Sequence, residues 1–224
     1  METAAVVRQA DEEKRIPARE QALVEAAATL KHKPVYAFIK RAFDIVAALM
    51  LSIVLLLPIA VVSILIKLDS EGPVIFRQQR MGKDGKIFTM YKFRSMRTDA
   101  PSEVATRDFE NSNEYITRFG GFLRRTSLDE IPQLLNILLG QMSFVGYRPV
   151  CLTETELNEL RMAYGVFFVK PGLTGLAQVS GRDNVTSEKK AALDAQYVHN
   201  RGLRMDLWCL VKTVVVVFTG EGAL

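Results

Sequence analysis

Two adjacent carboxylates, Asp129 and Glu130, are the residues of this sequence best suited to chemistry. They follow the basic stretch Arg124-Arg125-Thr126-Ser127-Leu128 and precede an apolar pattern with helical spacing. An ionised carboxylate can attack phosphorus to give an acyl phosphate, while its neighbour holds a metal ion or organises charge. The same positions also suit helix capping, with Ser127 and Glu130 as a capping box or Asp129 as the cap itself. Both interpretations are open at this point.

Cations that could hold phosphate oxygens lie on both sides of the acidic pair. Phosphoryl chemistry needs such groups, and the arginine fork matches phosphate in a bidentate manner. Arg148 is distinctive because Gly146 precedes it and Pro149 follows it, which predicts a stiff segment. A basic surface that faces anionic lipid headgroups explains several of these cations equally well. The candidates are Arg77, Arg80, Lys92, Arg94, Arg124, Arg125 and Arg148.

A glycine-rich segment runs from Lys170 to Arg182. Glycine lets a backbone approach a ligand closely. The segment lacks the Gly-Lys-Ser/Thr of a Walker A loop and is not a dinucleotide fingerprint. It predicts a structured loop, and by itself it is weak evidence for a ligand site.

Composition limits the partners and the kind of metal site. The 224 residues carry a net charge of +4, and this mild basic excess suits an anionic partner such as a phosphorylated substrate or an acidic lipid. No nucleic-acid-binding signature is present, so we expect no nucleic acid partner. Two cysteines and two widely spaced histidines cannot form a Cys/His metal site, so any metal ion would need carboxylate and phosphate oxygens.

An uncharged run of 22 residues extends from Ile45 to Ile66. As a helix it would be roughly 33 Å long, which is enough to cross a hydrocarbon core of about 30 Å. Pro58 lies inside the run and favours a bend. Both flanks are basic, with Lys40 and Arg41 before the run, so the positive-inside rule gives no orientation. A spanning helix and a re-entrant helix therefore both remain open.

Turn residues and apolar spacing predict the other elements. Residues 74–81 and 86–93 are expected to form a β-hairpin around the turn Lys83-Asp84-Gly85. Helices are expected at 128–139, where Gly140 ends the helix, at 153–164 and at 187–201, with a further leader helix at 18–30. Residues 100–117 are expected to form a mobile loop. Residues 203–218 suit either a segment at the membrane interface or a buried core element.

Taken together, these stretches resemble the bacterial sugar transferase family, the monotopic polyprenyl-phosphate phosphoglycosyl transferases. The resemblance covers residues 40–219 and depends on six ordered motifs. They are Lys40-Arg41-Ala42-Phe43-Asp44; Gly72-Pro73-Val74 with Arg80-Met81-Gly82; Lys92-Phe93-Arg94-Ser95-Met96; Leu128-Asp129-Glu130-Ile131-Pro132-Gln133; Met142-Ser143-Phe144-Val145-Gly146-Tyr147-Arg148-Pro149; and Lys170-Pro171-Gly172-Leu173-Thr174-Gly175.

The resemblance implies an α-rich α/β fold, with a small cytosolic globule that contains a β-hairpin, a re-entrant membrane helix and interfacial amphipathic helices. The corresponding domains are a polar leader at 1–34, the re-entrant helix at 35–69 and the catalytic domain at 70–224. Lys40, Arg41, Asp44 and Pro58 would set the membrane topology. The catalytic domain would lie on the cytoplasmic face of the bacterial inner membrane, and the assembly can be a homodimer.

The implied reaction has two steps and depends on Mg²⁺. Asp129 would attack the sugar-bearing phosphate of a UDP-sugar, releasing UMP, and polyprenyl (undecaprenyl) phosphate would then take the phospho-sugar. Such a transfer is the first membrane step of surface glycan synthesis. Glu130 would assist at the metal, which both carboxylates would hold, or in proton handling. The substrate-binding and phosphate-binding residues would be Lys92, Arg94, Arg124, Arg148, Gly172, Thr174, Gly175, Gln178 and Arg182.

Two alternatives are kept beside this interpretation. The first is a membrane-anchored scaffold that binds anionic lipid without catalysis, and the second is a glycosyltransferase that releases UDP. Two residues also depart from the family pattern. Tyr147 stands where the family usually has proline, which removes a rigid residue beside Arg148. Leu57 stands where many members have serine, which leaves Pro58 without a neighbouring hydroxyl.

Overall fold

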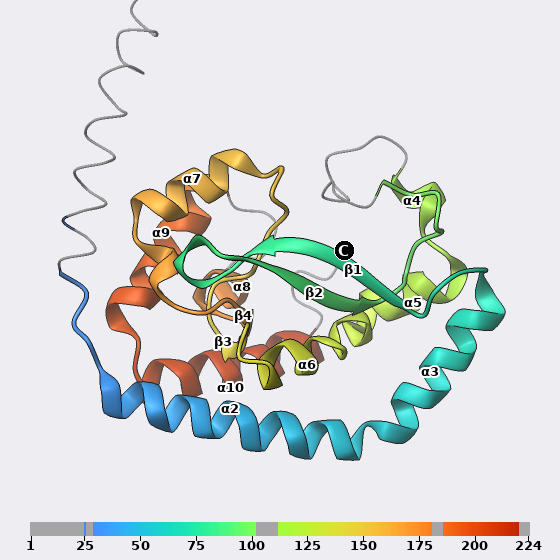
Figure 1. Ribbon diagram of the computed structural model, residues 1–224, viewed down its shortest axis with the longest axis horizontal. Helices are drawn as coiled ribbons and strands as arrows, with labels where there is room; N and C mark the ends of the chain where they lie inside the picture. Colours follow the sequence, from blue (N-terminus) through green and yellow to red (C-terminus); the bar gives the residue numbers. More distant parts are fainter. Residues whose placement is uncertain (1–24, 26–28, 102–111, 181–185, 220–224) are drawn as a thin grey trace, which may run out of the picture.

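The computed structural model describes residues 25, 29–101, 112–180 and 186–219. It is helix-rich and mixed α/β, as predicted, with a two-stranded antiparallel hairpin and a short parallel strand pair. Figure 1 shows the long helices α2 and α3 along one side of the molecule, the β-hairpin across its centre, and α7 and α9 near the hairpin turn.

The elements follow one another in a fixed order along the chain. They are α2 (Pro34–Val54), α3 (Leu56–Asp69), β1 (Ile75–Met81), the 3-10 turn η1 (Lys83–Gly85), β2 (Ile87–Phe93), α4 (Ser112–Tyr115), α5 (Arg118–Thr126), the 3-10 turn η3 (Leu128–Glu130), α6 (Gln133–Leu138), β3 (Ser143–Val145), α7 (Thr155–Ala163), η4 (Val166–Phe168), β4 (Gly172–Thr174), α8 (Leu176–Ser180), α9 (Ser187–Asn200) and α10 (Leu203–Thr219).

The uncharged run forms two helices, α2 and α3, which meet at Leu55 with a bend of 62°. Pro58 is the third residue of α3, so it cannot donate a backbone hydrogen bond to Val54, one turn earlier. The predicted bend is therefore confirmed. Taken singly, no helix in the described part of the chain is long and apolar enough to cross a membrane; the bent pair meets that test by length and composition.

The first turns of α2 are held to α10 through Asp206. The ammonium of Lys40 lies 2.8 Å from one carboxylate oxygen of Asp206, and the hydroxyl of Tyr36 donates to the same oxygen at 2.9 Å. The other oxygen accepts from Tyr197 of α9 at 2.7 Å. Because Asp206 is buried, this network fixes α2 against α9 and α10.

Two further residues of α2, Arg41 and Asp44, hold this helix against the end of α6 and against β3. Arg41 donates to the backbone carbonyls of Ile137 at 2.6 Å and Leu138 at 2.9 Å, at the end of α6, where carbonyls lack partners within the helix. Asp44 is buried and accepts from the hydroxyl of Ser143 at 3.0 Å and from the next backbone N–H at 3.1 Å. Residues 40, 41 and 44 thus lie on the face of α2 that contacts the globule, and their effect on membrane topology stays a prediction.

The predicted hairpin is confirmed. Its strands pair from Ile75 with Phe93 to Met81 with Ile87. Asp84 and Gly85 take left-handed conformations in the turn, with φ of 56° and 70°, which aspartate and glycine tolerate better than most residues.

The helix predicted at 128–139 is split, so that prediction is wrong in part. Ser127 takes a left-handed conformation (φ 56°) and ends α5, after which Leu128–Glu130 form a single 3-10 turn. Ile131 and Pro132 follow, and because the proline ring disfavours continuation of a helix, α6 begins only at Gln133. The Ser127 side chain makes no capping hydrogen bond, so the capping box is also wrong. Gly140 follows α6 with φ of 79°, as predicted.

The glycine-rich segment is more regular than a loop. It contains strand β4, which pairs in parallel with β3, and helix α8. A Cβ atom on Gly172 would lie 2.1 Å from the backbone nitrogen of Gly146, and one on Gly175 would lie 1.8 Å from the Gly146 carbonyl oxygen. These two glycines are therefore required for close packing between backbone segments.

The remaining helices follow the predicted pattern. Helices α7 and α9 confirm the predictions at 153–164 and 187–201. The 203–218 segment is the helix α10. Of the loop predicted at 100–117, residues 112–115 form α4, whereas 102–111 lie outside the described residues, as does most of the predicted leader helix.

Candidate active site

Four charged side chains from three separate segments meet around the acidic pair. The ammonium nitrogen of Lys92, on β2, lies 2.9 Å from Glu130 Oε1 and 3.5 Å from Asp129 Oδ2. Arg148, which follows β3, donates to the same Glu130 oxygen at 2.7 Å. The structure thus brings together Asp129, Glu130, Lys92 and Arg148, which we call the acidic–basic cluster.

Packing between β2 and α6 places the two halves of this cluster. Asn136 of α6 is fully buried, and its amide nitrogen donates to the Thr89 carbonyl at 2.7 Å. Its amide oxygen accepts from the Tyr91 backbone N–H at 3.1 Å. These bonds fix the strand directly before Lys92 against the helix that follows the acidic pair.

The electrostatics of Glu130 are dominated by two opposing effects. Burial alone raises the pKa of Glu130, but the charges and hydrogen bonds of Arg148 and Lys92 outweigh burial and hold that pKa well below its ordinary value. Glu130 is therefore ionised at any physiological pH.

The two carboxylates are held differently. Glu130 Oε1 accepts two charge-assisted hydrogen bonds, which withdraw electron density from it. Asp129 is 7% exposed, and within the described residues its carboxylate contacts only the ammonium of Lys92, at the longer distance of 3.5 Å. Asp129 is thus the less neutralised of the two and the better placed to act as a nucleophile.

The model of the family described as "Bacterial sugar transferase" matches residues 35–220, most of the chain. The chain belongs to the bacterial sugar transferase family. The family assigned by resemblance is therefore confirmed, and the cluster contains the acidic pair of one of its motifs.

Relatives within the bacterial sugar transferase family are about two-fifths identical to this chain. A UDP-galactose-lipid carrier transferase of Erwinia amylovora is 43% identical over 83% of this chain and 42% of its own length. The exopolysaccharide production protein PSS of Rhizobium leguminosarum bv. phaseoli is 42% identical over 82% of this chain and 98% of its own length. The UDP-glucose:undecaprenyl-phosphate glucose-1-phosphate transferase of Escherichia coli (strain K12) is 38% identical over 83% of this chain and 41% of its own length. The chain thus spans about two-fifths of the first and third relatives and nearly all of the second.

Within the described acidic–basic cluster, Asp129 and Glu130 carry the carboxylate oxygens that could bind a divalent cation. Their oxygens are hard donors of the kind that Mg²⁺ prefers. In the described part of the chain, no group of three or more His, Cys, Asp or Glu side chains could hold a metal ion. Asp129 and Glu130 would therefore share the ion with phosphate oxygens of a substrate, and the ion would supply charge neutralisation on those oxygens.

Two of the predicted basic residues lie apart from the cluster or at its edge. Arg94 is buried and donates to the backbone carbonyls of Ser70 at 2.6 Å and of Glu71. It therefore holds the end of α3 against the hairpin. Arg124 lies in the last turn of α5, one turn before Ser127.

The residues predicted in the glycine-rich segment are distributed over β4 and α8. Thr174 is buried, and its hydroxyl lies 2.6 Å from that of Thr213 on α10, so it faces the core. Gln178 has its amide nitrogen and oxygen buried without a hydrogen-bond partner among the described residues. A buried polar group without a hydrogen-bond partner costs free energy. Gln178 is therefore the residue of this segment that best fits a hydrogen bond to a ligand. Arg182 lies outside the described residues.

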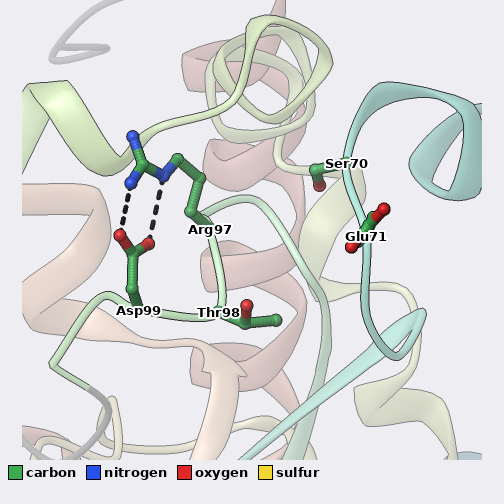
Figure 2. A pocket seen from close by; sticks show the side chains of 5 residues that line it. All are labelled: Ser70, Glu71, Arg97, Thr98 and Asp99. Atoms are coloured by element: carbon green, nitrogen blue, oxygen red, sulfur yellow. Dashed lines mark hydrogen bonds and ion pairs between the residues drawn. The ribbon is translucent and has the colours of Figure 1, made fainter.

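A recess of about 260 Å³ at the end of α3 lies beside Arg94, which donates to the carbonyls of two of its lining residues, and apart from the acidic–basic cluster. It is lined by Ser70, Glu71, Arg97, Thr98 and Asp99. Figure 2 shows that Arg97 and Asp99 face one another as an ion pair across one side of this recess. Because each neutralises the other, we assign the recess no part in the reaction.

The sequence reasoning missed the residues that support the cluster, above all Asn136, Arg161 and Asp194. All three are buried. Arg161 lies in α7 between buried Leu160 and Ala163. Arginine is almost never fully buried unless it is paired. Its position beside apolar residues on a helix could therefore have identified Arg161 as a paired, buried residue.

Proposed function

We propose that this protein transfers a phospho-sugar from a UDP-sugar to polyprenyl phosphate and releases UMP. The observation that carries the proposal is the acidic–basic cluster, in which a lightly neutralised Asp129 lies beside Glu130, whose Oε1 is paired with both Lys92 and Arg148. The relatives named as a lipid carrier transferase and as an undecaprenyl-phosphate glucose-1-phosphate transferase support the same chemistry.

In the first step, an oxygen of Asp129 attacks the phosphorus that carries the sugar. A bond forms between that oxygen and phosphorus, the bond from phosphorus to the bridging oxygen of the diphosphate breaks, and UMP leaves with the electron pair. Lys92 and Arg148, the two cations beside the carboxylates, would neutralise charge on the phosphate oxygens. An aspartyl phospho-sugar remains on the enzyme.

In the second step, a phosphate oxygen of the polyprenyl carrier attacks the same phosphorus. The bond to Asp129 breaks, its carboxylate is regenerated, and a polyprenyl diphosphate sugar is released. Glu130 stays ionised throughout, because Lys92 and Arg148 stabilise its charged form. Its role is to organise these cations, and with Asp129 it would hold a Mg²⁺ ion that supplies charge neutralisation.

The outer surface of the helices suits a membrane location for this reaction. Apolar side chains on α2 and α3 remain strongly exposed, as with Leu57 at 74% and Leu68 at 78%. On α10, Leu207 and Trp208 are also exposed; tryptophan is typical of the membrane interface. We propose that α2 and α3 enter and leave the bilayer on the cytoplasmic face of the inner membrane, where a soluble donor and a carrier phosphate meet.

The test is to incubate the purified protein in detergent or nanodiscs with a panel of UDP-sugars, undecaprenyl phosphate and Mg²⁺, and to identify the nucleotide released. UMP together with a lipid-linked diphosphate sugar is the expected result. Release of UDP would instead show transfer of the sugar without its phosphate. Binding to anionic vesicles without release of any nucleotide would favour the scaffold alternative and contradict catalysis.

A further inference from the structure

A buried ion pair joins helices α7 and α9 beside the acidic–basic cluster. Arg161 is 2% exposed and Asp194 is 1% exposed. Two guanidinium nitrogens of Arg161 donate to the same Asp194 oxygen, at 2.9 Å and 2.6 Å. Burying two charges costs free energy even when they pair. Stability of the fold alone therefore does not explain why this pair is buried.

The third nitrogen of Arg161 connects the pair to the cluster. It donates to the backbone carbonyl of Arg148 at 2.8 Å. The same guanidinium lies over the ring of Tyr147, 5.2 Å from its centroid. Arg161 therefore contacts two successive residues of the segment that carries the Arg148 side chain.

Tyr147 fixes this segment from the other side. Its side chain is 1% exposed, its ring packs edge-on against Phe167 at 5.4 Å, and its hydroxyl donates to the Met81 carbonyl at 3.4 Å. A proline at this position, as in the family pattern that the sequence resembles, would stiffen the chain covalently. Here packing and hydrogen bonding around Tyr147 supply the constraint.

We infer that Arg161, held in place by Asp194 and packed on Tyr147, is a positioning residue that fixes Arg148 and, through it, Glu130. The inference rests on the proposed function. Arg148 has a long side chain that is 45% exposed, so its direction depends strongly on where its backbone is held. A misplacement of about 1 Å at a reacting group can cost about 100-fold in rate.

The main variant replaces the buried pair with apolar residues of similar size, as Arg161→Met with Asp194→Leu. Such a replacement leaves no unpaired buried charge, so the fold is retained. Turnover measured as UMP release should fall about 10- to 100-fold, whereas KM for the UDP-sugar should change by less than about threefold. Arg161→Lys is the second variant: it keeps the charge beside Asp194 but cannot also reach the Arg148 carbonyl, and it should lose turnover while circular dichroism shows it folded at the assay temperature.

A double-mutant cycle with Arg148→Ala separates positioning from general stability. Arg148→Ala keeps the backbone carbonyl that Arg161 binds but removes the side chain that is to be positioned. The pair replacement should therefore cost little further turnover in this background. An equal loss in both backgrounds, or full turnover in both Arg161 variants, would overturn the inference. Absence of UMP release from the wild type would instead overturn the proposed function, and this inference with it.

Discussion

Arg148 donates to the carboxylate of Glu130 at 2.7 Å, although 18 positions separate the two residues in the chain. The contact draws the segment after β3 onto the 3-10 turn that carries the acidic pair. It neutralises Glu130, whereas among the described residues the Asp129 carboxylate has one hydrogen bond, the longer one from Lys92. The two neighbouring carboxylates are therefore held differently: Glu130 is paired with two cations, and Asp129 is the less neutralised of the two.

Replacing the nucleophile should abolish the reaction and leave the fold intact. Asp129→Asn keeps the size of the side chain but is a far poorer nucleophile, so UMP release should fall by several orders of magnitude. Asp84→Asn, in the exposed hairpin turn, is the matched control and should keep wild-type turnover. A tenth of wild-type turnover in Asp129→Asn would show that another group attacks the phosphate.

Removal of divalent cations should stop turnover. Only hard oxygen ligands from Asp129, Glu130 and the donor diphosphate are expected at the site, which favours Mg²⁺ or Mn²⁺. Excess chelator should prevent UMP release, and either ion should restore it. Undiminished release in excess chelator would exclude the metal from the reaction.

The pH dependence should change when one cation beside Glu130 is removed. In the wild type, Lys92 and Arg148 overcome the effect of burial and depress the pKa of Glu130, so this residue keeps its charge as the pH falls to moderately acidic values. Without Arg148, burial is less opposed, so the pKa of Glu130 should rise. As the pH is lowered, the residual turnover of Arg148→Ala should therefore begin to fall at a higher pH than the turnover of the wild type does. A superimposable acid limb in the two proteins would contradict this account.

The topology of α2 and α3 can be tested by labelling from one side of intact cells. His32→Cys and Lys86→Cys place exposed thiols before and after the bent pair. Both should resist a membrane-impermeant maleimide added outside and react after lysis, because a re-entrant pair keeps both ends in the cytoplasm. Both native cysteines are buried, and burial raises the pKa of Cys209 to about 11, so they should not compete.

The control for that experiment is Pro58→Leu. It restores the backbone donor to Val54 and should shift part of the population to a spanning form, in which residue 32 becomes accessible from outside. Labelling of residue 32 but not residue 86 in the chain with native Pro58 would contradict the re-entrant topology.

Local features were predictable because their causes lie within a few residues. Pro58 removes a hydrogen bond one turn away, and the bend falls there. Asp84 and Gly85 form the hairpin turn, and Gly140 ends a helix, since each accepts a left-handed backbone. The prediction of one helix at 128–139 failed because the left-handed Ser127 and Pro132 together outweighed a continuous apolar pattern.

The sequence alone thus determined the bent apolar helix, the hairpin, the adjacent carboxylates and the family, because these depend on neighbouring residues or on ordered motifs. The tertiary structure decided which of the many cations reach the carboxylates. It selected Lys92 and Arg148, directed Arg94 to the end of α3 and buried Arg161 against Asp194. It also showed that Gly172 and Gly175 serve backbone packing. These outcomes depend on how distant elements pack, and a charge or a glycine carries no local signal of the partner it will meet across the fold.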